Sequence, residues 1–334
     1  MELAVLGTGS AVPDRCVSNA DIAAAAGVDP AWIVRKTGIR ERRWSDPGQA
    51  TSDLAVAAAR QALAAAGIEA GRVALIIVAT STPDALLPPT ASYVQRALGA
   101  VDAVAFDINS VCSGFVFALS VAQAQMALLG GYALVVGADT YSRILNPRDR
   151  KTVVLFGDGA GAVVVGGTPQ PRATFGETVL FSFGELADLI RVPAGGSRRP
   201  YSPAVHEQGL HYFTMDGFAV RRFVQDRLPE LIHKYLLTCT IPADRVRHLI
   251  PHQANKVLLD ALLPHLELPN ASMHQTVVHY GNTAAASIPI TLDHAARTGA
   301  LADGGLVLLV GFGGGMSVGL STIEVAKGGL PVPA

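Results

Sequence analysis

The chain has 334 residues, of which half are hydrophobic and 16% are charged, and its formal net charge is -1. This length suits one large domain or two medium ones with a substantial buried core. Because so little of the chain is charged, we expect part of its apolar surface to be covered by a second subunit. A near-neutral charge without a large basic cluster argues against nucleic acid as a partner.

Three features of the sequence bear on location and metal binding. Cys16, Cys112 and Cys239 are far apart and odd in number, which argues against a disulfide framework and favours a reducing cytoplasm. The N-terminus carries Glu2 where a signal peptide has basic residues, and no apolar run is expected to be long enough to span a membrane. The nine histidines lack metal-ligand spacing. We therefore expect a cytoplasmic protein with no metal site and no membrane contact.

Strand-like and helix-like segments alternate through the first half of the chain. The pattern predicts, in order, a strand at 3–6, a helix at 51–66, a strand at 73–80, a helix at 91–98, a strand at 101–107, a helix from 112 to about 129 and a strand at 132–137. Two further apolar runs, 152–156 and 160–165, flank a glycine-rich turn. The segment from about 168 to 212 is predicted to be a long ordered loop or insertion.

The same alternation returns from about residue 210. It predicts helices at 215–237, 255–263 and 283–298, and strands at 246–250, 306–310 and 317–325. Continuous apolar strands between helices are typical of an α/β protein whose sheets are buried on both faces. The two halves look like variants of one layout.

Cys112 lies between a strand-like segment that ends near Asp107 and a helix-like segment. A thiol at a helix N-terminus faces unpaired backbone N–H groups and the positive end of the helix dipole, which favour the nucleophilic thiolate. A cysteine considered alone is more often a buried and inert residue. Cys112 is therefore a candidate nucleophile only if other catalytic groups accompany it.

Three later segments supply such groups. His252 lies at a strand end ahead of a helix, and Asn282 lies on a turn that opens another helix. Considered separately, the first is more often structural and the second is better explained as a helix cap. The strand at 306–310 runs into the glycine loop 311–315, where backbone N–H groups can approach a ligand oxygen closely. Together these segments provide two neutral hydrogen-bonding groups and an oxyanion site for a nucleophile.

Two common motifs are matched only loosely. The segment 157–162 fits a dinucleotide fingerprint, and 315–319 fits a serine nucleophile elbow. Each continues into a strand-like run, whereas both motifs require a helix at that point. We exclude both functions.

Several segments in the same order resemble the β-ketoacyl-acyl-carrier-protein synthase III family of thiolase-fold condensing enzymes. They are 32–42, the segment around Cys112, 156–161, 192–197, 251–255 and 281–289. The resemblance implies an α/β thiolase-like fold with two related βα halves in a five-layered α-β-α-β-α arrangement. Residues 1–170 would form the half that carries the nucleophile, and residues 171–334 the half that carries His252 and Asn282. It also implies a homodimer.

The resemblance implies a catalytic triad of Cys112, His252 and Asn282. An acyl-CoA would acylate Cys112, with the backbone N–H groups of Cys112 and Gly314 holding the oxyanion. A malonyl thioester, possibly on acyl carrier protein, would then lose CO₂ while His252 and Asn282 stabilise the enolate. Phe312 would shield the site from water. Acyl-CoA is a substrate in this scheme, and no cofactor is implied.

The same likeness assigns CoA-binding residues. Trp32 and Arg150 would sandwich the adenine by stacking and cation–π contact. Asn255 and Gly217 would lie near the pantetheine. Without the family, Trp32 is better explained as a half-buried helix aromatic.

Three positions depart from the family pattern. Val257 stands where carrier-docking members commonly have arginine, and Phe218 stands where asparagine is usual after Gly217. Leu87 occupies the place of a residue that closes the acyl pocket, and an aliphatic side chain there could admit a group longer than acetyl. These departures leave fatty-acid initiation and specialised metabolism equally open.

Two rival functions remain at this point. One is an enzyme of the same fold, either an acyltransferase that moves the acyl group from Cys112 to a hydroxyl or amine of a natural product or a condensing enzyme with an aromatic partner. The other is a non-catalytic partner subunit of a condensing complex. Asn282 argues mildly against pure acyl transfer, and the pairing of Cys112 with His252 argues against the second.

Overall fold

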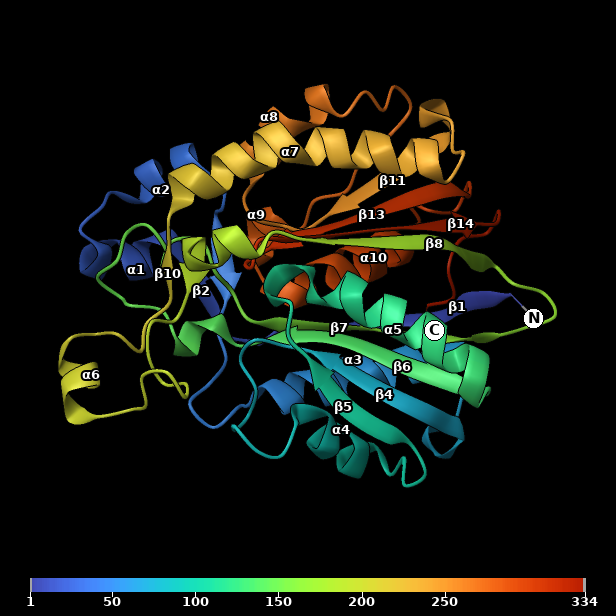
Figure 1. Ribbon diagram of the computed structural model, residues 1–334, viewed down its shortest axis with the longest axis horizontal. Helices are drawn as coiled ribbons and strands as arrows, with labels where there is room; N and C mark the ends of the chain where they lie inside the picture. The colour runs from blue at the N-terminus through green and yellow to red at the C-terminus, as the bar shows by residue number, and fades with distance from the viewer. Residues whose placement is uncertain (1, 333–334) are drawn as a thin grey trace.

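The computed structural model describes residues 2–332 of the chain (Figure 1). The main strands are β1 (Leu3–Ala11), β4 (Val73–Ala79), β5 (Val104–Ile108), β6 (Tyr132–Asp139), β7 (Gly159–Gly167), β8 (Ala173–Ser182), β11 (Val246–Pro251), β12 (Ser272–Met273), β13 (Gly305–Gly313) and β14 (Ser317–Val325). The two-residue and three-residue strands outside this set are β2 (Cys16–Ser18), β3 (Glu41–Arg43), β9 (Ile190–Arg191) and β10 (Thr214–Met215).

The helices of the described residues are α1 (Asn19–Ala26), α2 (Pro30–Thr37), α3 (Thr51–Ala66), α4 (Thr90–Leu98), α5 (Gly114–Leu129), α6 (Pro203–Glu207), α7 (Gly217–Thr238), α8 (Lys256–Leu262), α9 (Val277–Tyr280) and α10 (Ser287–Arg297). Short 3-10 turns connect them. Two of these turns matter for the site, η2 (Val111–Ser113) and η7 (Ala284–Ala286).

The main strands form one ten-stranded mixed sheet in the order β12-β11-β13-β14-β8-β1-β7-β6-β4-β5. Its two five-stranded parts meet only where β1 joins β8, through the single register pair Ala4 and Thr174. The other neighbouring strands pair over several residues, as β13 does with β14. The sheet therefore folds over on itself at this weak junction, and its two parts lie one above the other in Figure 1.

Helices lie between the two parts and on both outer faces (Figure 1). Alternate residues of β4 show the division, because Leu75 and Ile77 pack in the cluster that contains residues of α5, whereas Ile76 and Val78 pack in the cluster that contains residues of α3. α5 and α10 contact strands of both parts, and α7 covers the far side of the second part together with α8. The predicted five-layered α-β-α-β-α arrangement is confirmed.

The structure corrects two expectations from the sequence and assigns one apolar run. The segment 168–212 is not only a loop, since β8 lies in it and pairs with β14 along most of its length. The apolar run 152–156 is a turn with one bridge from Phe156, because its carbonyls bind side chains and loops instead of a neighbouring strand. The stretch Val111–Leu129 is long and apolar enough to cross a membrane by composition. Half of this stretch is buried, where α5 packs between the two sheet parts, and its last turn is exposed.

The division into residues 1–170 and 171–334 stays a prediction. The proposed boundary falls in the connection between β7 and β8. However, α10 of the second half packs on β1 and β7 of the first half, so the two segments share one core.

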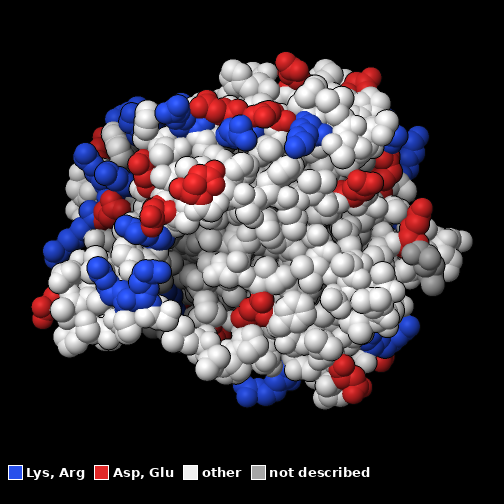
Figure 2. All heavy atoms as spheres, in the orientation of Figure 1, with Lys and Arg blue, Asp and Glu red and all other residues white. Residues whose placement is uncertain are grey.

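The charged residues leave one face of the molecule almost bare. Figure 2 shows lysine, arginine, aspartate and glutamate along the rim of this view and few over its centre, which Figure 1 places over α5, β6 and β5. β5 is the edge strand of its part, and Val104 on it is 54% exposed. Val101, Leu128 and Leu129 are exposed as well. An apolar sheet edge of this kind is a surface on which a second chain can pair.

A histidine pair makes the stability of the fold sensitive to acid. His248 Nδ1 lies 3.1 Å from His274 Nε2, and burial followed by the charge of His248 lowers the pKa of His274 to about 4. Burial also lowers the pKa of His248. Unfolded histidine has a pKa of about 6.5, so below this pH the unfolded chain binds protons at these two positions while the folded chain does not. This contribution to stability is present above about pH 6.5 and is lost as the pH falls towards 4.

We therefore expect His274→Gln to flatten the loss of stability between pH 7 and pH 4.5. Urea unfolding at both pH values gives the free energy of unfolding, and its decrease from pH 7 to pH 4.5 is compared between wild type and variant. His265→Gln, at an exposed histidine, is the control and should leave the wild-type pH dependence intact. Equal pH dependence in wild type and His274→Gln would contradict the assignment.

Candidate active site

Cys112 lies in the 3-10 turn η2, between the end of β5 and the start of α5 at Gly114. Val111 before it has a φ of 47°, a conformation that a β-branched residue rarely adopts. On its other side, Gly313 at the end of β13 lies against the cysteine. A Cβ added to Gly313 would lie 2.8 Å from Cys112 Cβ and 2.9 Å from its backbone nitrogen. The nucleophile candidate is therefore held between a strained turn and the glycine loop.

The expectation that Cys112 is held as thiolate by a helix N-terminus is wrong. Burial first, and then the nearby charge of Asp139, raises the pKa of the Cys112 thiol, and only its own backbone N–H lowers it. The α-helix begins two residues after the cysteine, so the dipole acts on a buried group whose charged form is poorly solvated. The resting form of Cys112 is the thiol.

His252 follows β11 and is fixed by two hydrogen bonds. Its backbone N–H donates to the Val310 carbonyl (2.8 Å), and its Nδ1 lies 2.7 Å from the Ser287 hydroxyl oxygen. That oxygen also accepts the Gln253 N–H at 3.3 Å, which leaves the hydroxyl hydrogen to be donated to Nδ1. The proton of the neutral ring then lies on Nε2. Burial lowers the pKa of His252 to about 3, so the ring is a neutral donor at physiological pH.

Phe312 connects the histidine to the cysteine. Its ring packs edge-on against His252 with 5.0 Å between centroids, and it directly precedes Gly313, which contacts Cys112. Phe312 is 2% exposed. The next residue, Gly314, is the first after β13, and its carbonyl accepts the Ser317 hydroxyl at 3.0 Å. The predicted oxyanion and shielding positions thus lie beside the predicted nucleophile.

Asn282 is held by its backbone and by one side-chain oxygen. Its N–H donates to the Leu155 carbonyl (2.8 Å), and its carbonyl accepts from Gly157 N–H (3.0 Å). Its Oδ1 accepts the backbone N–H of Ala284 at 2.9 Å, which leaves the Nδ2 amide as the donor for a ligand. Ala284 has a φ of 48°, so this loop, like that at Val111, is strained beside the site.

The structure brings the three predicted catalytic residues to one place. η2, which carries Cys112, packs against η7, which follows Asn282. Cys112, Phe312 and Ala284 belong to one apolar cluster, and the backbone of Ala284 also contacts His252. A thiol and two neutral donors therefore surround the end of β13.

A cavity of about 330 Å³ opens beside this cluster. Asn282 lines it, and so do the four residues predicted to bind CoA, which are Trp32, Arg150, Gly217 and Asn255. Cys112, His252 and Phe312 are buried and are not among its lining residues. Asn255 also caps α8 by accepting the Leu258 N–H at 2.8 Å. Its Oδ1 is used in the cap, so its amide nitrogen is the group available to a ligand.

Sequence reasoning missed three cations in the same wall. Lys36, Lys151 and Arg221 line the cavity and give it positive charge suited to phosphate groups. Lys36 lies in the family-like segment 32–42 and Lys151 directly follows Arg150. No sequence pattern marked Arg221, which lies in α7. Leu87, the predicted acyl-pocket residue, does not line this cavity and is 84% exposed.

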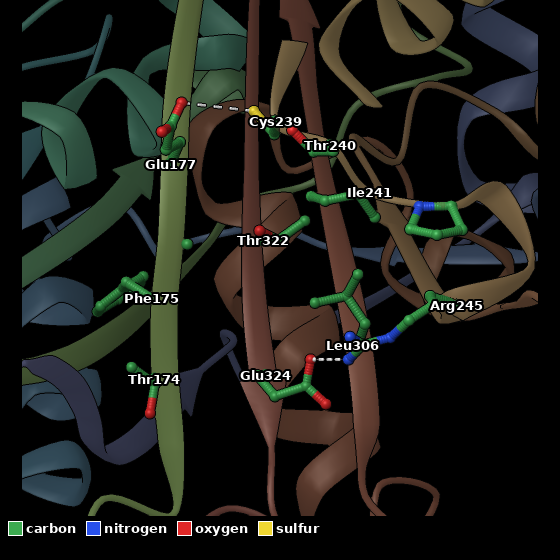
Figure 3. A pocket seen from close by; sticks show the side chains of 12 residues that line it. Thr174, Phe175, Glu177, Cys239, Thr240, Ile241, Arg245, Leu306, Thr322 and Glu324 are labelled. Atoms are coloured by element: carbon green, nitrogen blue, oxygen red, sulfur yellow. Dashed lines mark hydrogen bonds and ion pairs between the residues drawn. The ribbon is translucent and has the colours of Figure 1, made fainter. Parts of the chain in front are cut away.

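A second cavity of about 330 Å³ lies between β8 and the residues after α7 (Figure 3). It holds another thiol, Cys239, whose Sγ donates to Glu177 Oε2 at 3.6 Å. Burial and then the charge of Glu177 raise the pKa of Cys239. Arg245 and Glu324 on its wall pair with each other at 2.8 Å. None of the predicted catalytic residues lines this cavity, so the candidate site is the first one.

The close fit of Gly313 gives a test of the geometry. We expect Gly313→Ala to lower the free energy of unfolding by about 1–3 kcal/mol, because the new methyl group is forced against Cys112. Gly48→Ala, at a glycine with no neighbour within 4 Å, should change it by less than about 0.5 kcal/mol. Urea unfolding of both variants measures the difference. A Gly313→Ala variant as stable as Gly48→Ala would show that the strand does not abut the cysteine.

Comparison with known proteins identifies the chain. Family models of 3-oxoacyl-[acyl-carrier-protein] synthase III match residues 106–184, and of its C-terminal part residues 238–325. The chain is 58% identical to acetoacetyl CoA synthase of Streptomyces sp. (strain CL190), over 96% of this chain and 98% of that protein. It is 42% identical to β-ketoacyl-[acyl-carrier-protein] synthase III of Caldanaerobacter subterraneus subsp. tengcongensis, over 97% and 98% of the two chains.

Solved structures agree with these relatives. The 3-oxoacyl-(acyl carrier protein) synthase III of Pseudomonas aeruginosa PAO1 superposes with a TM-score of 0.89 at 38% identity, over 98% of this chain and 99% of that one. The priming β-ketosynthase of the R1128 polyketide pathway gives 0.91 at 32% identity, over 100% and 97%. The chain therefore belongs to the β-ketoacyl-acyl-carrier-protein synthase III family of thiolase-fold condensing enzymes, acyltransferases that join an acyl-CoA to a malonyl thioester.

Proposed function

We propose that Cys112, His252 and Asn282 are the catalytic residues of this condensing enzyme and that the cavity beside Asn282 receives the CoA thioesters. The observation that carries the proposal is the gathering of one thiol and two neutral donors around the end of β13, next to a cavity with cationic walls. A water-poor setting of this kind suits carbon–carbon bond formation, in which hydrolysis of the acyl group is the side reaction to avoid.

In the first step, Cys112 attacks the carbonyl carbon of an acyl-CoA. The sulfur forms a new thioester, and the CoA sulfur leaves with the proton that the thiol gives up. The Cys112 and Gly314 backbone N–H groups are the proposed donors to the tetrahedral oxyanion; loss of one such donor typically costs about 10²–10³ in rate. The Gly314 N–H donates in none of the loop and turn hydrogen bonds among residues 2–332, which supports its availability.

In the second step, a malonyl thioester loses CO₂ and the bonding electrons pass to an enolate. His252 Nε2–H and Asn282 Nδ2–H donate to its thioester oxygen. The enolate carbon then attacks the acyl carbonyl on Cys112, and the departing Cys112 thiolate takes one proton from solvent to restore the thiol. The two neutral donors stabilise the negative charge of the enolate by hydrogen bonding. Because the pKa of His252 is lowered to about 3, its ring stays neutral and does not take up a proton during this step. Phe312, packed on the imidazole, keeps water away.

The remaining cavity residues are assigned to CoA. Trp32 and Arg150 enclose the adenine, Asn255 and Gly217 contact the pantetheine, and the cations of the wall bind phosphate. We propose malonyl-CoA as the extender, since the relative at 58% identity is named for a product that stays on CoA. The two residues after Asn255 support this choice. Lys256 is already paired with Asp260 at 2.6 Å, and Val257 has no charge with which to bind an acidic carrier protein.

We also propose a cytoplasmic homodimer formed through the uncharged face of Figure 2. The exposed edge of β5 and the exposed side chains of Val101, Val104 and Leu128 support this interface. Leu87, which is exposed in a single chain, would close the acyl pocket only when a second copy covers it. The alternative, transfer of the acyl group to a hydroxyl or amine, is not favoured, because the relatives and neighbours described above are named as acetoacetyl CoA synthase or β-ketoacyl synthases.

Intact-mass measurement tests the nucleophile directly. Wild-type protein incubated with acetyl-CoA or longer acyl-CoAs should gain one acyl group, and Cys112→Ala should gain none, while Cys239→Ala should behave as wild type. Adding malonyl-CoA should then release CO₂ and yield a β-ketoacyl-CoA. An adduct that survives Cys112→Ala, or acylation without CO₂ release, would overturn the proposal.

The tautomer of His252 gives a second test. We expect Ser287→Ala to slow CO₂ release from malonyl-CoA about tenfold, because the ring loses the hydroxyl that holds its proton on Nε2. Acylation of Cys112 should change less than about twofold, since His252 takes no part in the oxyanion site. Ser45→Ala removes a hydroxyl that is also buried but does not hydrogen-bond to His252, and it serves as the matched control. Equal rates in Ser287→Ala and Ser45→Ala would refute the tautomer assignment.

A further inference from the structure

Asp139 is a fully buried carboxylate that the proposed mechanism does not use. It ends β6 in the first half of the fold and is 0% exposed. Among residues 2–332 it forms no salt bridge, although a buried charge is costly unless it is paired or heavily hydrogen-bonded. Its hydrogen bonds must therefore be the reason that the site tolerates it.

One oxygen of Asp139 accepts several hydrogen bonds from the turn that follows β4. Oδ1 accepts the backbone N–H groups of Ser81 (2.9 Å) and Thr82 (3.1 Å) and the Thr82 hydroxyl (2.8 Å). The hydroxyls of Thr80 and Ser81 approach the same atom at 3.2 Å. This oxygen fixes the strand ends of the first half to one another.

The other oxygen reaches across to the second half. Asp139 Oδ2 accepts the backbone N–H of Ala285 at 3.0 Å. The backbones are in contact here, since a Cβ on Gly137 of β6 would lie 2.3 Å from the Ala285 carbonyl oxygen. Ala285 also lies beside Gly114 at the start of α5, the helix that follows the cysteine. The carboxylate thus joins the nucleophile half to the loop that carries Asn282.

This loop orients both proposed donors. The Ala284 N–H donates a hydrogen bond to Asn282 Oδ1, so the position of this N–H determines where the amide nitrogen of Asn282 points. The Ala284 backbone also contacts His252. Ala284 is held in a left-handed conformation, which is strained for a residue with a Cβ, and the hydrogen bond from the next N–H helps to keep it there. Asp139 provides that anchor.

We propose that Asp139 is a positioning residue for the condensation half-reaction, which holds the 284–285 peptide so that Asn282 and His252 face the enolate oxygen. The inference rests on the proposed roles of those two residues. It assigns no contact between Asp139 and substrate.

The charge of Asp139 has a second effect that a purely structural residue would lack. The titratable groups that face it are Cys112 in η2 and Tyr141 beyond the end of β6, whose hydroxyl binds Ser81 at 3.0 Å. After burial, the negative charge of Asp139 raises the pKa of the Cys112 thiol. Removing the charge lowers that pKa, so acylation should speed up at neutral pH while condensation slows down.

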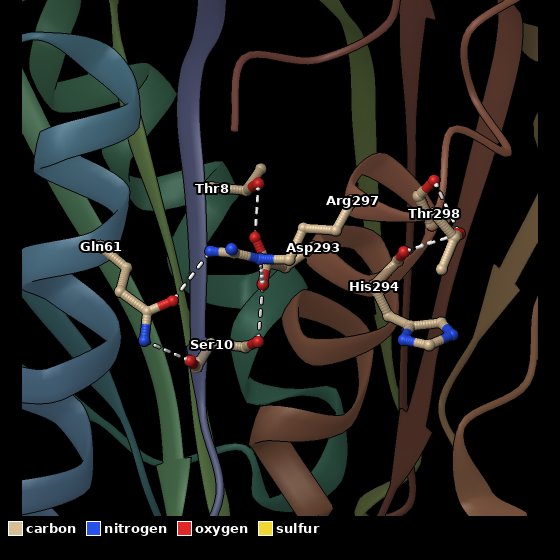
Figure 4. A network of polar contacts seen from close by, with 8 residues as sticks. Thr8, Ser10, Gln61, Asp293, His294, Arg297 and Thr298 are labelled. Carbon is tan, nitrogen blue, oxygen red and sulfur yellow. Dashed lines mark hydrogen bonds and ion pairs between the residues drawn. The ribbon is translucent and has the colours of Figure 1, made fainter. Parts of the chain in front are cut away.

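The test compares Asp139→Asn with Asp293→Asn. Asp293 is a matched control, because it is also 0% exposed and also joins the two halves, by accepting from Thr8 (2.8 Å) and Ser10 (2.6 Å) of β1 and from Arg297 of α10 (2.7 Å) (Figure 4). It lies away from the 284–285 peptide. Each variant is assayed for acylation by acetyl-CoA between pH 6 and 9, for CO₂ release from malonyl-CoA, and for thermal unfolding.

For Asp139→Asn we expect kcat for CO₂ release and condensation to fall at least about tenfold, with KM for malonyl-CoA within about threefold of wild type. Acylation by acetyl-CoA should be faster than in wild type across pH 6 to 9, because losing the negative charge lowers the pKa of the Cys112 thiol. For Asp293→Asn we expect lower thermal stability with an unchanged ratio of acylation to CO₂ release. A parallel loss of both activities in Asp139→Asn, or unchanged CO₂ release, would overturn the inference.

A second variant covers the case in which Asp139→Asn fails to fold. Thr82→Val removes the hydroxyl that lies 2.8 Å from Asp139 Oδ1 and keeps the carboxylate. CO₂ release that falls severalfold, with acylation retained, supports the inference, and unchanged CO₂ release overturns it. Asn282→Ala separates this question from the proposed function. If Asn282→Ala releases CO₂ at the wild-type rate, the proposed role of Asn282 fails, whatever Asp139→Asn does to acylation.

Discussion

The hydrogen bonds of one short loop are the constraint on which the site depends. The backbone of Asn282 forms hydrogen bonds with the 155–157 turn. The Ala284 N–H donates to the Asn282 side chain, and the Ala285 N–H donates to Asp139. The loop therefore belongs to both halves of the fold at once. Each half supplies part of the site, and this shared backbone, together with the end of β13, fixes the relative positions of Asn282, His252 and Cys112.

Burial gives the groups of the site a common electrostatic character. The same loss of solvent raises the pKa of Cys112, lowers that of His252 to about 3 and raises that of Asp139 to about 6. The two proposed catalytic groups are consequently neutral in the resting protein. A site of this kind stabilises charge only where donors already point, so its selectivity comes from the orientation of N–H groups and not from acid–base strength.

The resemblance to the condensing-enzyme family predicted the layered fold and the triad, and the residues alone placed the main candidates at strand ends, where an α/β fold gathers side chains at one edge of the sheet. Trp32, Arg150, Gly217 and Asn255 line one cavity as expected. The sequence could not predict the pKa of Cys112, since the helix-end rule assumes solvent that the buried turn lacks. Nor did it reveal Ser287 or Asp139, whose importance depends on partners 35 and 146 residues away along the chain. β8 was missed because its polar residues hide the strand pattern.

The central position of α5 has a consequence for how the protein is made. The helix emerges from the ribosome with the first half, but β13 and β14, which cover its far side, are synthesised more than 150 residues later. During that interval the side of α5 that β13 and β14 later cover has no partner strands, and apolar surface of this kind promotes aggregation of incompletely folded chains.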